Sequence, residues 1–146
     1  MRPGDVQRMS AGTGVLHSEF NHSQENGLHF LQIWIEPAQR GISPSYEQKA
    51  FPTAERQGQW SLVASQDGRD GSVGVNQDVN LYASLLSAGD HLTTPPSRYA
   101  WLHVVKGSIE VNGERLTTGD AAAFTPDEHV ELTSSDASEV LLFDLA

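Results

Sequence analysis

The sequence predicts an all-β fold, either a sandwich or a small barrel, and three observations support that prediction. Apolar and polar residues alternate with a period of two over many short segments, which is typical of strands with one buried face. Gly, Asn and Asp stand at the corners between these segments, as they do in hairpins. The chain has 146 residues, which is enough for one full-size domain and too few for two.

The N-terminal part is expected to form three strands, at residues 6–10, 15–20 and 28–36. The third has the strongest pattern, because Phe30 and Trp34 alternate with Leu31, Ile33 and Ile35 and both faces are therefore largely apolar. A strand with two apolar faces is typically covered on both sides. Residues 1–36 are therefore predicted to need sheet partners that their own span does not supply.

Residues 37–57 follow Pro37 and contain the turn-rich stretch 40–46. No clear period follows that stretch, so this region is predicted to be an irregular linker with one helical turn.

Residues 58–146 are predicted to form a complete barrel. The dipeptide Asn112-Gly113 is the strongest short hairpin signal in the chain. The expected strands are residues 60–65, 73–75, 78–86, 99–105, 108–111, 114–116, 121–124, 128–133 and 139–145.

Composition excludes several classes of partner and site. The net charge is −10, which repels phosphate backbones and argues against a nucleic-acid partner. No basic amphipathic stretch suggests a membrane surface. The chain has no Cys, which excludes disulfides and thiolate zinc sites. The first residues lack the apolar run of a signal peptide, so the expected location is the cytoplasm.

His17 and Glu19 are the clearest candidates for metal ligands. They are two residues apart on an expected strand, so their side chains project from the same face. An imidazole and a carboxylate suit iron, manganese, nickel or zinc. Two ligands do not hold a catalytic metal, because three or four are needed. The alternative is a polar pair on a half-buried strand.

Residues 2–19, RPGDVQRMSAGTGVLHSE, resemble the middle of the pirin family of bicupins, and bacterial pirin-like quercetin dioxygenases most of all. The resemblance covers essentially the whole chain. Its other matching stretches are LQIWI (31–35), GISPSYEQ (41–48), DGRDGS (67–72), VVKG (104–107) and EVLLFDL (139–145).

The resemblance implies a cupin-type double-stranded β-barrel at residues 58–146, preceded by the end of an N-terminal cupin. In the family the N-terminal barrel binds metal through an H-x-H motif and a later His and Glu. His17 and Glu19 match those last two ligands. The H-x-H motif would precede Met1, so half of the family metal site is expected to be absent. His22, His29 or a two-fold dimer with two His17–Glu19 pairs are alternative sources of further ligands.

The second barrel is expected to be metal-free. No H-x-H motif lies between Gly89 and Gly107, where Pro and Ser fill residues 95–97. His91 is expected in a loop, and His103 is expected to point into the barrel as a hydrogen-bonded residue. His129 is close to the ligand offset of the second cupin motif without matching it. The aromatic residues are expected to fill the core or to line a ligand cavity; they are Trp34, Tyr46, Trp60, Tyr82, Tyr99 and Trp101.

Two functional hypotheses follow. The first is a non-catalytic module that binds a small aromatic ligand or a protein, with no cofactor in the isolated chain. The second is a metal-dependent quercetinase-like dioxygenase, with iron or another divalent transition metal completed by another chain or by residues outside this sequence. In the second, Glu19 acts as a base toward the flavonol hydroxyl. Exposed strand edges and the apolar segment favour a homodimer through the N-terminal strands.

Overall fold

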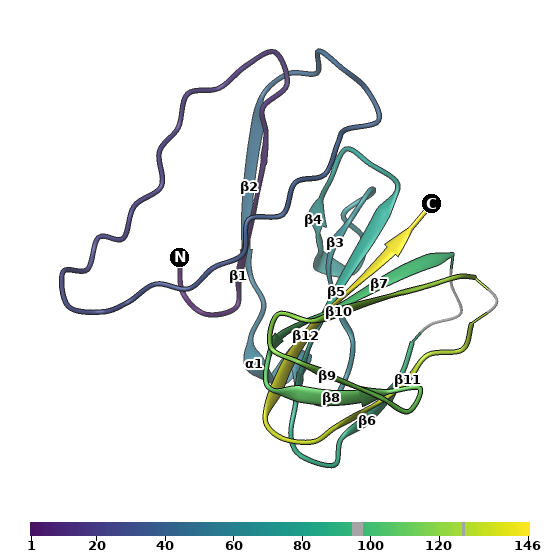
Figure 1. Ribbon diagram of the computed structural model, residues 1–146. Helices are drawn as coiled ribbons and strands as arrows, with labels where there is room; N and C mark the ends of the chain where they lie inside the picture. Colours follow the sequence, from purple (N-terminus) through teal and green to yellow (C-terminus); the bar gives the residue numbers. More distant parts are fainter. Residues whose placement is uncertain (95–97, 127) are drawn as a thin grey trace.

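The protein is mostly β-sheet, as the alternation predicts. The computed structural model describes residues 1–94, 98–126 and 128–146. Within these residues the strands form a two-stranded, a six-stranded and a four-stranded sheet (Figure 1). The expectation about Pro and Ser at residues 95–97 lies outside the described residues.

The six-stranded and four-stranded sheets form the two walls of the barrel. The order of the first is β10-β7-β12-β5-β3-β4 and that of the second is β6-β11-β8-β9. The strands are β3 (Ser61–Ser65), β4 (Val73–Gly74), β5 (Val79–Leu86), β6 (His91–Thr93), β7 (Tyr99–Lys106), β8 (Ser108–Val111), β9 (Glu114–Thr117), β10 (Ala121–Phe124), β11 (Glu131–Ser134) and β12 (Ser138–Leu145). The short turn η1 spans Arg69–Gly71.

Alternation along the strands fills the space between the two walls. On β7, Ala100, Leu102 and Val104 are buried, and they join Ile109 and Leu132 from the opposite sheet in one apolar cluster. Leu102, Ile109 and Leu132 are fully excluded from solvent. Burial of apolar area on this scale is the main force that holds the two walls together.

The β8–β9 hairpin confirms the Asn112-Gly113 prediction. Both residues have positive φ, 48° for Asn112 and 85° for Gly113. This is the backbone of a tight hairpin turn whose twist matches that of the flanking strands.

The remaining sheet packs on the outside of the barrel. β1 (Asp5–Ser10) and β2 (Ser45–Ala50) pair antiparallel. Val6 and Phe51 pack with Leu81 and Ala83 of β5, on the face of β5 opposite to the barrel core. The linker prediction is wrong at residues 45–50, because that segment finds a ladder partner in β1. The expected helical turn is α1 (Thr53–Arg56).

Residues 11–44, hereafter the arm, join β1 to β2 and extend away from the barrel (Figure 1). The two ends of the arm approach each other closely at Gly12. A side chain at this position would collide with the carbonyl of Ile42, so the approach requires glycine. The Thr13 amide also donates to the Ile42 carbonyl at 3.1 Å. Further along, the Ala38 amide donates to the Asn76 carbonyl at 2.8 Å. The first hydrogen bond therefore joins the two ends of the arm to each other, and the second attaches the arm to the barrel.

The strands expected at residues 15–20 and 28–36 are not formed. Both segments are without ladder hydrogen bonds, and their apolar side chains are exposed apart from that of Val15, which is half-buried. An apolar strand needs a neighbouring strand to satisfy its backbone and a second layer to cover its face. The described residues supply neither to these two segments.

No described helical segment has the length and apolar content needed to cross a lipid bilayer.

Candidate functional site

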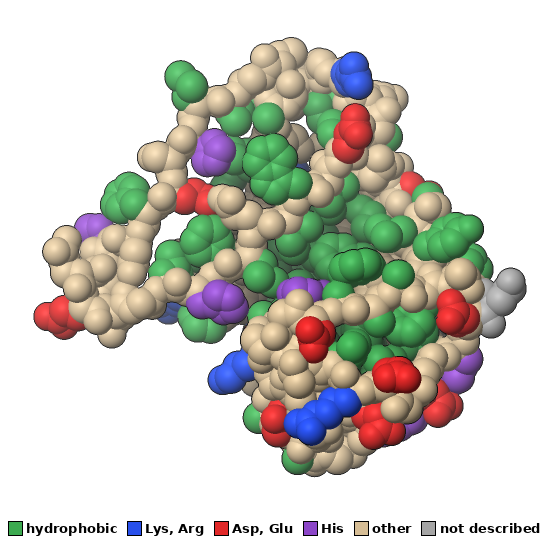
Figure 2. Space-filling view, in the orientation of Figure 1, with side chains coloured by type: hydrophobic (Ala, Val, Ile, Leu, Met, Phe, Trp, Pro, Cys, Tyr) green, Lys and Arg blue, Asp and Glu red, His purple; other side chains and the backbone are tan. Residues whose placement is uncertain are grey.

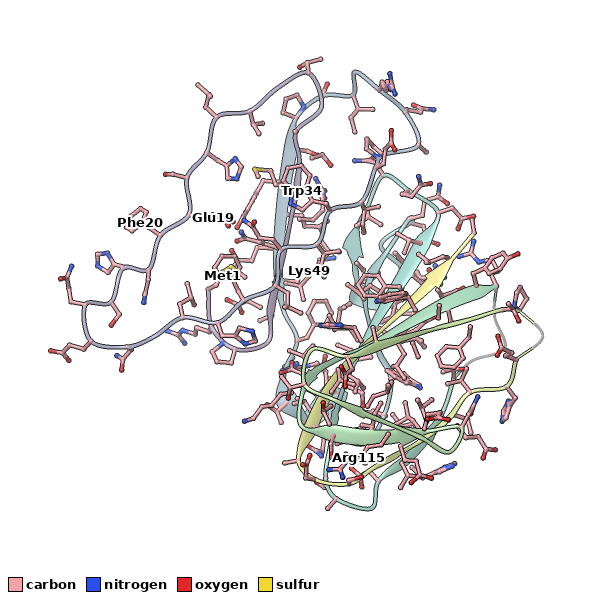
Figure 3. All side chains as sticks on the ribbon, in the orientation of Figure 1. Met1, Glu19, Phe20, Trp34, Lys49 and Arg115 are labelled. Carbon is pink, nitrogen blue, oxygen red and sulfur yellow. The ribbon has the colours of Figure 1, made fainter. Side chains whose placement is uncertain are left out.

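The two predicted metal ligands lie on the first half of the arm. His17 and Glu19 are both exposed and belong to no strand. Glu19 is anchored by two side-chain amides. Gln7 Nε2 of β1 donates to its Oε1 at 2.8 Å, and Gln32 Nε2 donates to its Oε2 at 2.8 Å. Figure 3 shows Glu19 turned from the arm toward β1 and β2.

The donors fit a divalent transition metal in kind but not in number. Imidazole and carboxylate are suitable ligands, and a catalytic site needs at least three of them from protein. In residues 1–94, 98–126 and 128–146, no group of three or more His, Asp and Glu side chains is placed to hold a metal ion. His22 and His29 share the arm with His17, and they do not complete such a group.

β1 is held in place by a cluster of charges on its other face. Lys49 Nζ lies 3.0 Å from Glu47 Oε1, the Gly74 amide donates to Glu47 Oε2 at 2.9 Å, and Arg8 lies 3.5 Å from the same oxygen. The hydrogen bond from Lys49 and then that from Gly74 lower the pKa of Glu47 from its ordinary value. Because Gly74 belongs to β4, this cluster attaches the β1–β2 sheet to the barrel. Gln7 belongs to that sheet.

A second group of imidazoles and carboxylates lies on the outer face of the four-stranded sheet. His129 Nε2 lies 3.2 Å from Glu131 Oε1, and His91 Nε2 lies 4.0 Å from Glu131 Oε2. With Glu110 and Asn112 they line a shallow cavity of about 420 Å³. His91 was expected in a loop but lies in β6. His129 and Glu131 are two residues apart, so on an extended chain their side chains project from the same face. This spacing is the feature of the sequence that could have predicted the group.

An apolar cavity of about 390 Å³ lies between the arm and the barrel. Ile33, Trp34 and Ile35 line it from the arm, and Phe143 and Leu145 line it from β12. Trp34 is 92 % exposed. Figure 2 shows apolar side chains gathered in the hollow between the arm and the barrel.

The interior of the barrel is filled by side chains. Trp60 and Tyr82 pack against its core, whereas Trp34, Tyr46, Tyr99 and Trp101 are exposed, so core filling explains only the first two aromatics. The expectation that His103 points inward is wrong. The buried residues of β7 are its neighbours Leu102 and Val104, and His103 lies on the opposite face.

In comparison with known proteins, the N-terminal and the C-terminal part of the chain each match a family model. Residues 1–35 match the family model described as Pirin, and residues 62–145 match the model described as Quercetinase C-terminal cupin domain. A quercetin 2,3-dioxygenase of Escherichia coli K12 is 43 % identical over 144 residues, which are 97 % of this chain and 61 % of that protein.

Solved structures show the same relationship. The crystal structure of YhhW from Escherichia coli superposes with a TM-score of 0.89 at 41 % identity, over 98 % of this chain and 61 % of that one. Bacterial pirin YhhW in complex with nickel(II) superposes with a TM-score of 0.87 at 42 % identity, over 97 % and 61 %. The chain thus spans about three fifths of the length of these relatives.

Proposed function

Because the chain belongs to the pirin family of cupins, we propose that it acts as a metal-dependent, quercetinase-like dioxygenase in an assembly that completes the ligand set around His17 and Glu19. One observation carries the proposal. The Glu19 carboxylate is held at both oxygens by amides from two separate segments, and it lies two residues from His17. The relatives named quercetin 2,3-dioxygenase and the nickel(II) complex of YhhW support it.

The roles of the residues follow from their chemistry. A divalent metal, when bound, supplies Lewis acidity at the site. His17 contributes an imidazole ligand. Glu19 contributes a carboxylate that accepts the proton of a flavonol hydroxyl, since an ionised carboxylate within hydrogen-bond reach is a competent general base.

Loss of the carboxylate tests this role. In Glu19→Gln, the rate of quercetin-dependent dioxygen consumption by nickel-loaded protein is expected to fall on the order of 100-fold, because the amide cannot accept a proton. An oxygen electrode measures the rate. Glu25→Gln is the matched control, since Glu25 is an exposed carboxylate of the same arm. Equal rates in the two variants contradict the proposal.

The sheet partners that the described residues do not supply to the arm can come from a second copy of the chain. Residues 1–50 hold four Lys or Arg and five Asp or Glu, whereas residues 51–146 hold five and fourteen. Residues 1–50, which include the arm, are therefore nearly neutral, and the acidic residues are concentrated in the barrel. Two arms can pair while the acidic barrels stay apart, and two His17–Glu19 pairs then offer four donors.

A homodimer is the expected state at tens of micromolar, and light scattering after size exclusion should return twice the 15.9 kDa of the chain. Ile33→Lys is expected to shift the protein to monomer, because it places a charge in the apolar segment of the arm. Tyr99→Ser, which changes an exposed aromatic residue of the barrel, should leave the dimer intact. A monomeric wild-type protein contradicts this part of the proposal.

The apolar cavity favours a second candidate function, a non-catalytic module that binds a flat aromatic ligand against Trp34 and Phe143. Such cavities, with apolar walls, suit small hydrophobic ligands. Quenching of tryptophan fluorescence by quercetin would report the binding. Under this candidate, His17→Ala leaves the quenching unchanged and no variant alters dioxygen consumption.

A further inference from the structure

We infer that Gln7 and Gln32 are positioning residues that hold the carboxylate plane of Glu19 for metal binding. The inference rests on the proposed function, in which Glu19 is a metal ligand. These two side chains are not among the predicted metal ligands. Gln7 precedes Glu19 in the sequence and Gln32 follows it, and the fold brings both to its carboxylate.

The geometry restrains the terminal torsion of Glu19. Gln7 Nε2 donates to one carboxylate oxygen and Gln32 Nε2 donates to the other, each at 2.8 Å. The last torsion of a glutamate is otherwise broad, and rotation about it would now break a hydrogen bond at each oxygen. A carboxylate offers about four lone-pair sites. Each oxygen of Glu19 therefore keeps a site for a cation or a proton.

The two amides come from supports of different kinds. Gln7 belongs to β1 and lies opposite Gln48 of β2 in the ladder. Gln32 lies on the second half of the arm, next to the cavity residues Ile33 and Trp34. Glu19 thus joins β1 to both halves of the arm (Figure 3). The carboxylate is oriented by a strand on one side and by a segment that borders the cavity on the other.

The amide of Gln7 is itself oriented. The Tyr46 hydroxyl lies 3.2 Å from Gln7 Oε1 and 2.6 Å from Gln48 Oε1, and Gln48 Nε2 donates to Asp5 Oδ2 at 3.2 Å. The amide oxygen of Gln7 therefore faces Tyr46, and its nitrogen faces Glu19. A row of neutral polar groups on β1 and β2 sets the direction in which Gln7 donates.

Neutral donors are the appropriate chemistry for this task. A Lys or Arg beside Glu19 would form an ion pair and compete with a metal cation. The neighbouring cation Arg8 turns the other way, donating to the Gly74 carbonyl at 2.8 Å. Amides orient the carboxylate and leave its negative charge available, as partners around metal ligands commonly do.

Nickel(II) affinity tests the inference. In Gln7→Met and in Gln32→Met of the full chain, the dissociation constant from calorimetry is expected to rise about 10–100-fold. The melting temperature is expected to stay near that of the wild type, because Gln32 is exposed and Gln7 is only half-buried. Methionine keeps the length of the side chain and removes the donor. Gln24→Met is the matched control, since Gln24 is an exposed glutamine of the same arm and is not one of the two amides that donate to Glu19. Affinities equal to that of the control overturn the inference.

A metal-free measurement separates this inference from the proposed function. In the nuclear magnetic resonance spectrum, the side-chain NH₂ signals of Gln7 and Gln32 should shift in Glu19→Ala, and that of Gln24 should not. If wild-type protein binds no nickel in a His17-dependent way but these shifts occur, the proposed function fails and the positioning of Glu19 stands. If the two signals do not respond to Glu19, the inference is overturned whatever the nickel binding.

Discussion

Replacing His17 by alanine is expected to reduce bound metal from near-stoichiometric to background. His17 supplies the only imidazole within two residues of Glu19, and a transition-metal site with an incomplete donor set loses its ion readily. Elemental mass spectrometry on untagged protein, purified without chelator, measures iron, nickel, manganese, copper and zinc per chain.

The two neighbouring histidines provide the controls for this measurement. His22 and His29 lie on the same arm and are exposed, like His17. His22→Ala and His29→Ala should retain the metal content of the wild-type protein. Unchanged metal in His17→Ala would show that His17 is not a ligand, and loss in His22→Ala or His29→Ala would assign the missing donor to that residue.

Replacing Leu102 by alanine is expected to lower the free energy of unfolding by about 2–5 kcal/mol, the range for leucine truncation in a packed core. Leu102 is 0 % exposed and lies on β7, between β10 and β12 in the six-stranded sheet. Its side chain contributes to the cluster that joins the two walls of the barrel. Urea unfolding followed by tryptophan fluorescence measures the change.

Leu16→Ala is the matched control for Leu102→Ala, because the chemical change is the same and Leu16 is 104 % exposed. Its free energy of unfolding should differ from the wild-type value by less than about 0.5 kcal/mol. A loss comparable to that of Leu102→Ala would contradict this expectation and would show that Leu16 is covered in solution. The difference between the free energies of unfolding of the two variants therefore reports how far Leu16 is buried relative to Leu102.

The local signals in the sequence were most reliable where neighbours in the chain are also neighbours in space. Asn112-Gly113 predicted the β8–β9 hairpin, and the ladder pairs Val111 with Glu114 across that turn. β2 was missed because its partner β1 precedes it by some 35 residues of arm. β6 was missed because its three residues pair with β11, far along the chain. Such pairings are decided by long-range contacts and leave little local pattern.

The same distinction holds for the candidate site. His17 and Glu19 could be found from their spacing, since two residues apart is a strand-face relation. Gln7 and Gln32 could not, because twelve and thirteen residues separate them from Glu19. No periodicity relates a side chain on β1 to one on the far half of the arm.

The sequence by itself determined the all-β class, the turns of the barrel and the chemistry available to the site. These follow from the alternation of apolar residues, from the backbone preferences of Asn and Gly, and from residue type. Only the tertiary structure decided that Glu19 is held by two amides, that His103 lies outside the barrel core, and that the arm has no ladder partner in the described residues. Each of these depends on which distant segments meet, because a strand gains its hydrogen bonds and its buried face only from a neighbour.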